Sequence, residues 1–194
     1  MSLKINKSGI IEASCTGINE NLLGNSNIIL TQNYNGDSYM SYTIPDISMI
    51  STGTHLTVSV YVEMHNVKSL RRAGVEPSFH KENYQTYLDD IYVGAWTTDF
   101  TDRKIRIYAK STIYATITGV GQHAIYIQGA EFNDGGYITL SYPKLEIGDV
   151  PTPWCPNKND EIYTGNQGFI EHYLVDNDCK FYNNHLECNE LIEI

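Results

Sequence analysis

The sequence predicts an all-β fold: an antiparallel two-sheet jelly-roll sandwich with short β segments at both termini. The 194 residues include 15 Tyr and 15 Gly, and only 19% of them are charged. β-branched and aromatic side chains fit a pleated surface. Runs with a period of two recur along the chain, and helical periodicity is almost absent. Because most runs alternate between apolar and polar residues, they exclude a parallel sheet, whose strands are apolar on both faces.

The first expected elements are short. Residues 3–14 predict two strands around a Ser-Gly turn, and residues 21–27 predict a polar loop. Residues 27–34 and 38–45 then flank Asn-Gly-Asp at 35–37. Asn-Gly tolerates the positive φ that two-residue turns require, so this pattern predicts a β-hairpin.

Longer alternating runs follow. In 55–65, every second residue from Leu56 to Met64 is expected to face the core. The same parity is expected to direct Ile91, Val93 and Ala95 inward in 89–96. The remaining expected strands are 103–110, 113–119, 123–129 and 136–148. A helical turn or two is expected only within 76–90.

Composition and charge exclude several classes of function. A net charge of −10 argues against binding to nucleic acid or to anionic membranes. No apolar run is long enough for a transmembrane helix, so no membrane insertion is expected, and the first residues lack the apolar segment of a secretory signal. The four cysteines, Cys15, Cys155, Cys179 and Cys188, match no zinc spacing. Free thiols are expected, and a Cys179–Cys188 bridge across a hairpin stays open.

The segment that ends the last long strand is rich in proline. Pro143 predicts an edge or a bulge, because proline cannot donate to a ladder. Pro151, Pro153 and Pro156 stop the strand from continuing. Trp154 is expected to fold back over the open end of the sandwich in a packing role.

The same segment resembles the end of the carbohydrate-binding-module-like jelly rolls carried by bacteriophage tail and baseplate proteins. In these modules a Lys-Leu-Glu-x-Gly element precedes Thr-x-Trp-x-Pro and an acidic residue. The matching residues here are Lys144, Leu145, Glu146, Gly148, Thr152, Trp154, Pro156 and Asp160. Residues 21–26, "NLLGNS", resemble the start of such a module, and both chain ends resemble flanking segments of such tail proteins. The chain departs from the pattern at Cys155 and in 65–85, which is expected to be a long insertion.

The resemblance implies a domain organisation and a function. It implies an N-terminal β arm (1–20), a jelly roll (21–156) and a C-terminal β appendage (157–194) for assembly. It implies a non-enzymatic virion protein, made in the bacterial cytoplasm, that binds a host cell-surface saccharide or other tail and baseplate proteins. A homo-oligomer is expected, with a trimer as the first guess. The alternatives are a purely structural tail or fibre subunit and an accessory module of a glycan-processing enzyme.

Candidate ligand-binding residues come from strand parity. Aromatic rings stack on the C–H faces of sugars, and planar polar groups bond to hydroxyls. The residues expected on one outward saccharide face are Tyr61, Tyr92, Trp96, Arg106, Tyr108, Tyr126 and Gln128. No catalytic motif accompanies them, and the adjacent pair Asp89–Asp90 points to opposite faces of a strand. No cofactor is expected beyond a possible structural calcium ion, whose ligands would be Glu20, Asp134 and Asp149.

Overall fold

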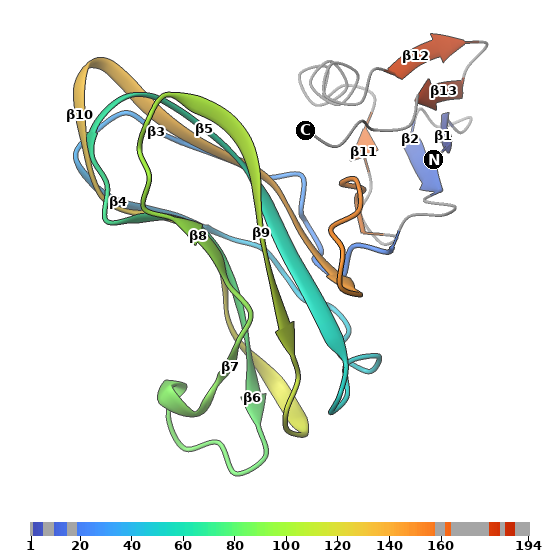
Figure 1. Ribbon diagram of the computed structural model, residues 1–194. Helices are drawn as coiled ribbons and strands as arrows, with labels where there is room; N and C mark the ends of the chain where they lie inside the picture. Colours follow the sequence, from blue (N-terminus) through green and yellow to red (C-terminus); the bar gives the residue numbers. More distant parts are fainter. Residues whose placement is uncertain are drawn as a thin grey trace.

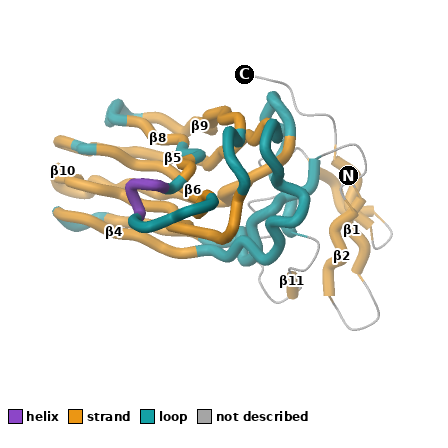
Figure 2. The backbone as a smooth tube through the Cα atoms, turned by 90° about the horizontal axis from the view of Figure 1, so that it is seen from below, coloured by secondary structure: helices purple, strands orange, loops and turns teal. Residues whose placement is uncertain are grey.

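The computed structural model describes residues 2–5, 10–14, 19–157, 162–163, 179–182 and 185–188. It confirms the all-β prediction. The strands are β1 (Ser2–Ile5), β2 (Ile10–Ser14), β3 (Ile29–Gln32), β4 (Gly36–Ser41), β5 (His55–Ser69), β6 (Arg72–Lys81), β7 (Ile91–Tyr92), β8 (Ala95–Thr97), β9 (Arg103–Thr112), β10 (Ile117–Ile147), β11 (Ile162–Tyr163), β12 (Cys179–Tyr182) and β13 (His185–Cys188). One 3-10 turn, η1 (Tyr87–Asp89), lies in the segment expected to be helical (Figure 2). Within the described ranges, no helix is long and apolar enough to cross a membrane.

Strand β10 belongs to both sheets of the sandwich. Its first half, 117–128, pairs with β6, and β4 pairs on the other side of the same half. Its second half, from 131 to 147, pairs with β5 and with β3. Strands β7 and β8 extend the layer that we call the β6 sheet, and β9 extends the β5 sheet. All these pairings are antiparallel, and the long strands curve over to form two layers (Figure 1).

The Asn-Gly-Asp turn does not form the predicted hairpin. Strands β3 and β4 flank it, but each pairs with a different half of β10. The turn instead binds the bend of β10: Asn35 Oδ1 accepts from Phe132 N at 3.1 Å, and Asp37 Oδ1 accepts from Gly129 N at 2.7 Å. Gly129 has a φ of +59°, which favours glycine at the bend. The turn therefore carries the chain from one sheet to the other.

The core lies between the two sheets and follows the predicted parity. Every second residue of β5 from Leu56 to Met64 is buried, and so are Ile91, Val93 and Ala95. Ile125 and Ile127 come from the first half of β10, and Ile138, Leu140 and Leu145 from the second half. Full burial of such a side chain contributes about 1.5–3 kcal/mol. The inward register predicted for 55–65 and 89–96 is confirmed.

The segment expected to be an insertion contains a central strand instead. Strand β6 places Ala73, Val75 and Phe79 in the core. The sequence does not predict this strand, because proline within a run argues against a central position in a sheet and Pro77 lies within it. The structure accommodates Pro77 where the β6–β10 register shifts, between Val120 and His123. The Pro77 carbonyl still accepts from Val93 N at 2.9 Å.

Strands from the two chain ends pair with each other. The small sheet has the order β11-β2-β1-β13-β12 and lies apart from the long strands (Figure 1). Ser2 is opposite Glu187 and Leu3 is opposite Leu186, so β1 joins the N-terminal and C-terminal strands. Strands from the two chain ends thus meet within one chain. The segment 191–194 lies outside the described residues. The domain boundaries at 20/21 and 156/157 stay a prediction.

Candidate functional site

The seven expected saccharide-binding residues do not share one face. Tyr92, Trp96, Tyr126 and Gln128 belong to the β6 sheet, whereas Tyr61, Arg106 and Tyr108 belong to the β5 sheet. Their outward parity holds, because their strand neighbours pack in the core. Strand parity alone does not reveal which of the two layers a strand joins, so the expectation of a single face was wrong.

An aromatic row crosses the outer face of the β6 sheet. Tyr39 of β4 is opposite Tyr126 of β10, Tyr126 is opposite Gly74 of β6, and Gly74 is opposite Trp96 of β8. Tyr39 is 76% exposed and Trp96 is 49% exposed, while Tyr126 is buried. Gly74 has no side chain to separate Tyr126 from Trp96.

Two glycines allow the indole of Trp96 to lie close to the sheet. A Cβ at Gly94 would lie 2.3 Å from Cζ3 of Trp96, so the ring occupies the space above Gly94. A Cβ at Gly74 would lie 2.0 Å from the carbonyl oxygen of Ala95, so β8 approaches β6 too closely for any side chain there. The backbone therefore sets the position of the ring.

Arg72 occupies the space between the two rings. Its guanidinium carbon lies 4.7 Å from the Tyr126 ring centroid and 5.7 Å from that of Trp96, within the range of cation–π contacts. Arg72 Nε donates to Gln128 Oε1 at 2.6 Å, and Nη1 donates to Glu76 Oε2 at 3.4 Å. Arg72 therefore contacts two aromatic rings and two polar side chains.

Glu76 completes the polar part of this surface. Its side chain is 8% exposed, and Oε2 also accepts from the Tyr126 hydroxyl at 3.1 Å. Burial, and then the Glu76 charge, raises the pKa of Tyr126, so this hydroxyl stays a donor. One carboxylate and one guanidinium balance each other in charge. We call the set of Tyr39, Arg72, Glu76, Trp96, Tyr126 and Gln128 the Trp96 platform.

Three platform residues were missed by the sequence reasoning. Tyr39, Arg72 and Glu76 are absent from the expected ligand contacts. The signal that could have identified Arg72 and Glu76 is the alternation of Arg72, Gly74 and Glu76 with the apolar Ala73 and Val75. That alternation is a strand pattern, but Pro77 interrupts it.

Tyr92 lies on the same sheet in a different environment. It is opposite Ser78, and its hydroxyl donates to the Tyr87 carbonyl at 2.9 Å. Nearby, Asp90 accepts from Ser78 Oγ at 2.8 Å, and its other oxygen lies 2.7 Å from His80 Nδ1. This is not a nucleophile–base pair, because the buried Ser78 hydroxyl donates to the carboxylate and not to the histidine.

The outer face of the β5 sheet holds the other three candidates. A shallow depression there is lined by Ile29, Tyr61, Val62, Glu63, Lys104, Thr139 and Ser141. The Arg106 guanidinium carbon lies 5.5 Å from the Tyr61 ring centroid, and Nη2 donates to Ser59 Oγ at 2.7 Å. Burial lowers the pKa of Arg106. Tyr108 is 53% exposed. The Arg106 side chain therefore contacts Ser59 and Tyr61 of the neighbouring strand in the same sheet.

The expected calcium ligands do not meet. Asp149 Oδ1 lies 2.8 Å from His55 Nδ1 at the start of β5, whereas the Asp134 carbonyl accepts from Asn66 near the other end of β5. His55 and Asn66 are eleven steps apart along β5, which corresponds to roughly 36 Å of extended strand. Glu20 precedes Asn21, which is bonded to the second half of β10. No group of three metal-ligating side chains occurs among the residues searched, which are those the structure describes.

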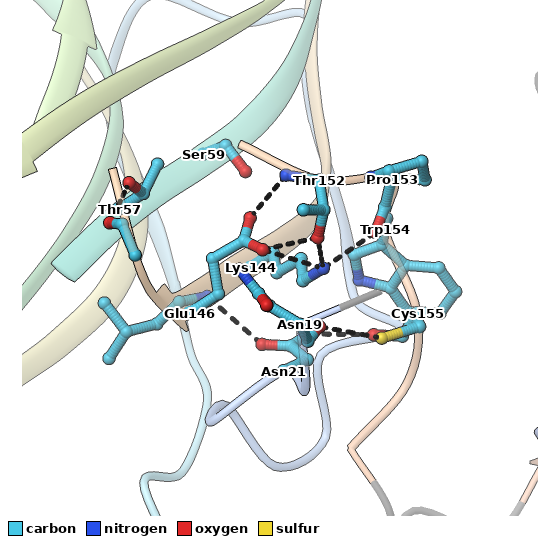
Figure 3. Close-up of polar contacts among 12 residues, drawn as sticks. Asn19, Asn21, Thr57, Ser59, Lys144, Glu146, Thr152, Pro153, Trp154 and Cys155 are labelled. Carbon is cyan, nitrogen blue, oxygen red and sulfur yellow. Dashed lines mark hydrogen bonds and ion pairs between the residues drawn. The ribbon is translucent and has the colours of Figure 1, made fainter. Parts of the chain in front are cut away.

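The Lys-Leu-Glu motif holds the proline-rich segment against the β5 sheet (Figure 3). Lys144 Nζ donates to Thr152 Oγ1 at 2.6 Å and to the Pro153 carbonyl at 2.8 Å. Glu146 Oε1 accepts from Thr152 N at 2.8 Å, and Glu146 Oε2 accepts from the Thr152 hydroxyl. Burial lowers the pKa of Lys144. These residues of the matched motif are structural contacts.

Asn21 ties the start of the module to its end. Its side-chain amide donates to Ser26 Oγ and to the carbonyls of Pro143 and Cys155, at 2.9, 3.2 and 3.0 Å. Its Oδ1 accepts from Leu23 N and Leu145 N, both at 3.1 Å. Asn21, the first residue of the "NLLGNS" motif, therefore bonds to Pro143 and Leu145, more than 120 residues later in the chain. These bonds join the start of the module to the Lys-Leu-Glu motif at its end.

Trp154 has the expected packing role in a different place. It is 3% exposed, its ring centroid lies 5.1 Å from that of Tyr142, and Nε1 donates to the Pro143 carbonyl at 3.3 Å. Tyr142 and Pro143 form the predicted bulge, where the β10–β5 register shifts and Tyr142 has a φ of +54°. Neither Tyr142 nor Trp154 belongs to the core between the sheets. Trp154 therefore covers the bulge and not the open end of the sandwich.

Comparisons with known proteins find similar structures only. No family model and no curated protein matches the chain. The tripod (BppUct-A-L) from the baseplate of bacteriophage Tuc2009 has a TM-score of 0.47 and 20% identity, covering 80% of this chain and 65% of that chain. The CBM22-1–GH10 modules of Clostridium thermocellum xylanase 10B, complexed with xylohexaose, have a TM-score of 0.40 and 9% identity, covering 72% of this chain and 30% of that chain.

A third similar structure is the CBM22-2 xylan-binding domain from Paenibacillus barcinonensis Xyn10C. Its TM-score is 0.36 at 12% identity, covering 76% of this chain and 99% of that domain. These similar structures are thus a phage baseplate protein and two proteins that contain carbohydrate-binding modules.

Proposed function

We propose that this chain is a non-enzymatic phage tail or baseplate component whose jelly roll binds a host surface saccharide at the Trp96 platform. The observation that carries the proposal is the half-exposed indole of Trp96, seated above Gly94 beside Arg72. Sugars bind such surfaces because their C–H faces stack on the ring while their hydroxyls meet fixed polar groups. The virion assignment rests on the motif resemblance of residues 21–27 and 136–160.

The charge of the platform favours an uncharged saccharide. Arg72 is the cation of this surface, and it already donates to Glu76 and Gln128. A phosphate or carboxylate group of a ligand would meet the Glu76 carboxylate beside it. The chain as a whole carries a net charge of −10, which adds long-range repulsion. A neutral pyranose ring avoids both the repulsion from Glu76 and the repulsion from the net charge.

Useful binding requires several copies. One stacked indole contributes on the order of 1 kcal/mol, less than a tenfold change in affinity. Linked sites multiply weak affinities without new contacts. We therefore infer a homo-oligomer, with a trimer as the first guess, assembled with other tail or baseplate proteins.

A purely structural tail subunit is the second candidate. The observation that favours it is the small sheet in which β1 and β13 join the two chain ends. In the described part, its strand order ends in β11 and β12, and sheet edges offer backbone groups to a neighbouring chain. A glycan array distinguishes the two candidates, since a structural subunit retains no saccharide. Turnover of cell-wall polysaccharide would indicate the third possibility, a module of a glycan-processing enzyme.

The deciding experiment compares two exposed aromatic residues on opposite sheets. Trp96→Ala should reduce binding to host cell walls by at least tenfold for the multivalent protein, with little change in melting temperature. Tyr108→Ala, on the β5 sheet, is the matched control and should bind like the wild type. Equal binding by both variants would refute the platform. A large fall in the melting temperature of Trp96→Ala would make Trp96 a structural residue.

A further inference from the structure

Two cysteines meet in the register of the small sheet. Strands β12 and β13 pair antiparallel, and Cys179 is the direct partner of Cys188. The pairs between them and the hairpin end are Lys180 with Glu187, Phe181 with Leu186, and Tyr182 with His185. The sequence spacing left a Cys179–Cys188 bridge open, and this register places the two residues opposite each other.

The position within the ladder also suits a bridge. Tyr182 and His185 are the described pair nearest the connection, and two residues separate them in the sequence. In a two-residue β-hairpin, the pair next to the turn is the hydrogen-bonded kind. Hydrogen-bonded and non-hydrogen-bonded pairs alternate along an antiparallel ladder. On that pattern, counting back from Tyr182 and His185 along the register makes Cys179 and Cys188 a non-hydrogen-bonded pair. Such pairs have Cα atoms about 4.5 Å apart, inside the 4.4–6.8 Å range of disulfides.

We propose that Cys179 and Cys188 form an intramolecular disulfide that links β12 to β13 under oxidising conditions. The reaction is thiol–disulfide exchange with a low-molecular-weight disulfide such as oxidised glutathione. One cysteine thiolate attacks the glutathione disulfide and releases one reduced glutathione. The second cysteine then attacks the mixed disulfide, forms the protein S–S bond and releases the second reduced glutathione. Both cysteine protons are transferred to the solvent or to the two leaving thiolates.

The bridge would stabilise the junction between the two chain ends. β13 pairs with β1 as well as with β12, so a link from β12 to β13 holds three strands in one unit. A reducing cytoplasm keeps the thiols free, and an oxidising medium outside the cell closes the bridge. The small sheet thus becomes harder to unfold after the protein leaves the cell.

Peptide mapping of the full chain tests the proposal directly. Trypsin cleaves after Lys158 and Lys180, which separates Cys179 in peptide 159–180 from Cys188 in peptide 181–194. After incubation with oxidised glutathione and alkylation of the remaining thiols, the two peptides should appear as one cross-linked species, two hydrogens lighter than their sum. Treatment with dithiothreitol before digestion should release them as two alkylated peptides.

Variants distinguish this pair from other pairings. Cys179→Ser and Cys188→Ser should each abolish the cross-link and lower the melting temperature of the oxidised protein to that of the reduced protein. Cys15→Ser is the matched control and should retain the cross-link. Full alkylation of both cysteines after oxidation would overturn the proposal. So would a bridge from either residue to Cys15 or Cys155, or a disulfide-linked dimer on a non-reducing gel.

Discussion

Lys144 Nζ lies 3.2 Å from Glu146 Oε2, and neither side chain is exposed to solvent. The two residues project from the outer face of β10, where the proline-rich segment covers them through Thr152 and Pro153. A buried ion pair stabilises little by itself, because desolvation offsets much of the attraction. Its effect here is to fix the segment that leaves the module.

Removing one partner of this pair should be costly. Lys144→Met leaves the Glu146 carboxylate buried with only the Thr152 donors, so we expect the free energy of unfolding to fall by about 3–5 kcal/mol. Urea denaturation followed by tryptophan fluorescence measures this, since Trp154 lies in the same segment.

The double variant Lys144→Met/Glu146→Leu is the control for this prediction. It removes both charges together, so most of the lost stability should return. If the single and double variants were equally unstable, packing of the side chains and not the charge pair would hold the segment.

Asn21 should be a second residue on which the free energy of unfolding depends strongly. Asn21→Ala removes contacts to Ser26, Pro143, Cys155, Leu23 and Leu145 from one buried site. Because each orphaned buried group costs about 1–3 kcal/mol, we expect a loss of at least about 3 kcal/mol in the free energy of unfolding.

Asn19→Ala provides the comparison for Asn21→Ala. The Asn19 amide makes one exposed bond, to the Ile147 carbonyl at 2.9 Å, so its removal should change stability by less than about 1 kcal/mol. Thermal and urea unfolding of the two variants side by side check the difference. Similar losses would mean that the "NLLGNS" motif does not close the module.

The fold was predictable where strands alternate cleanly. The parity of β5 and the bulge at Pro143 follow from the period of side-chain directions and from the missing N–H of proline. Strand β6 was missed because Pro77 argues locally against a central strand. The register shift that accommodates it depends on β10, more than 40 residues later in the chain.

Only three of the six platform residues were expected from the sequence, and the platform was not expected as a surface. Trp96, Tyr126 and Gln128 follow the expected outward parity on the β6 sheet. Tyr61 and Arg106 obey the same parity on the opposite sheet. Assigning a strand to a sheet requires its pairing partner, which is a long-range contact. The Asn-Gly-Asp turn also depends on a long-range contact. Its sequence favours a hairpin locally, but Asn35 and Asp37 instead bond to the bend of β10.

Tyr126 should make stability depend on pH in the alkaline range. Burial raises its pKa in the folded protein above the ordinary value of 10.0. Its contribution is therefore complete below pH 10 and is lost as the pH rises further, because the unfolded chain releases the proton first. The slope of this loss approaches about 1.4 kcal/mol per pH unit.

Tyr126→Phe should have a shallower decline of stability above pH 10 than the wild type. The buried Tyr42, whose pKa is raised mainly by burial, contributes to the decline in both proteins. Tyr108→Phe controls for the loss of an exposed hydroxyl. Urea unfolding between pH 8 and pH 11 measures the slopes, and parallel curves for wild type and Tyr126→Phe would contradict the prediction.

Glu76 should determine which charge class of saccharide the platform accepts. Glu76→Gln keeps the shape of the side chain and an acceptor for the Tyr126 hydroxyl, but it leaves Arg72 without its balancing charge. We expect the variant to gain affinity for anionic wall polymers such as teichoic acid by about tenfold at low salt, and to lose that gain at high salt. Affinity for neutral glycans should change little.

The matched control is Glu63→Gln on the opposite sheet. Glu63 Oε1 also accepts from a tyrosine hydroxyl, that of Tyr137 at 2.7 Å, so the two substitutions remove the same charge from similar contacts. Only Glu76→Gln should change the preference, measured by calorimetry on intact walls and on walls stripped of teichoic acid. An equal gain in both variants would reflect net charge alone. If the wild type bound anionic polymers in preference to neutral ones, the ligand class would be wrong, whereas loss of binding in Trp96→Ala would still identify the platform.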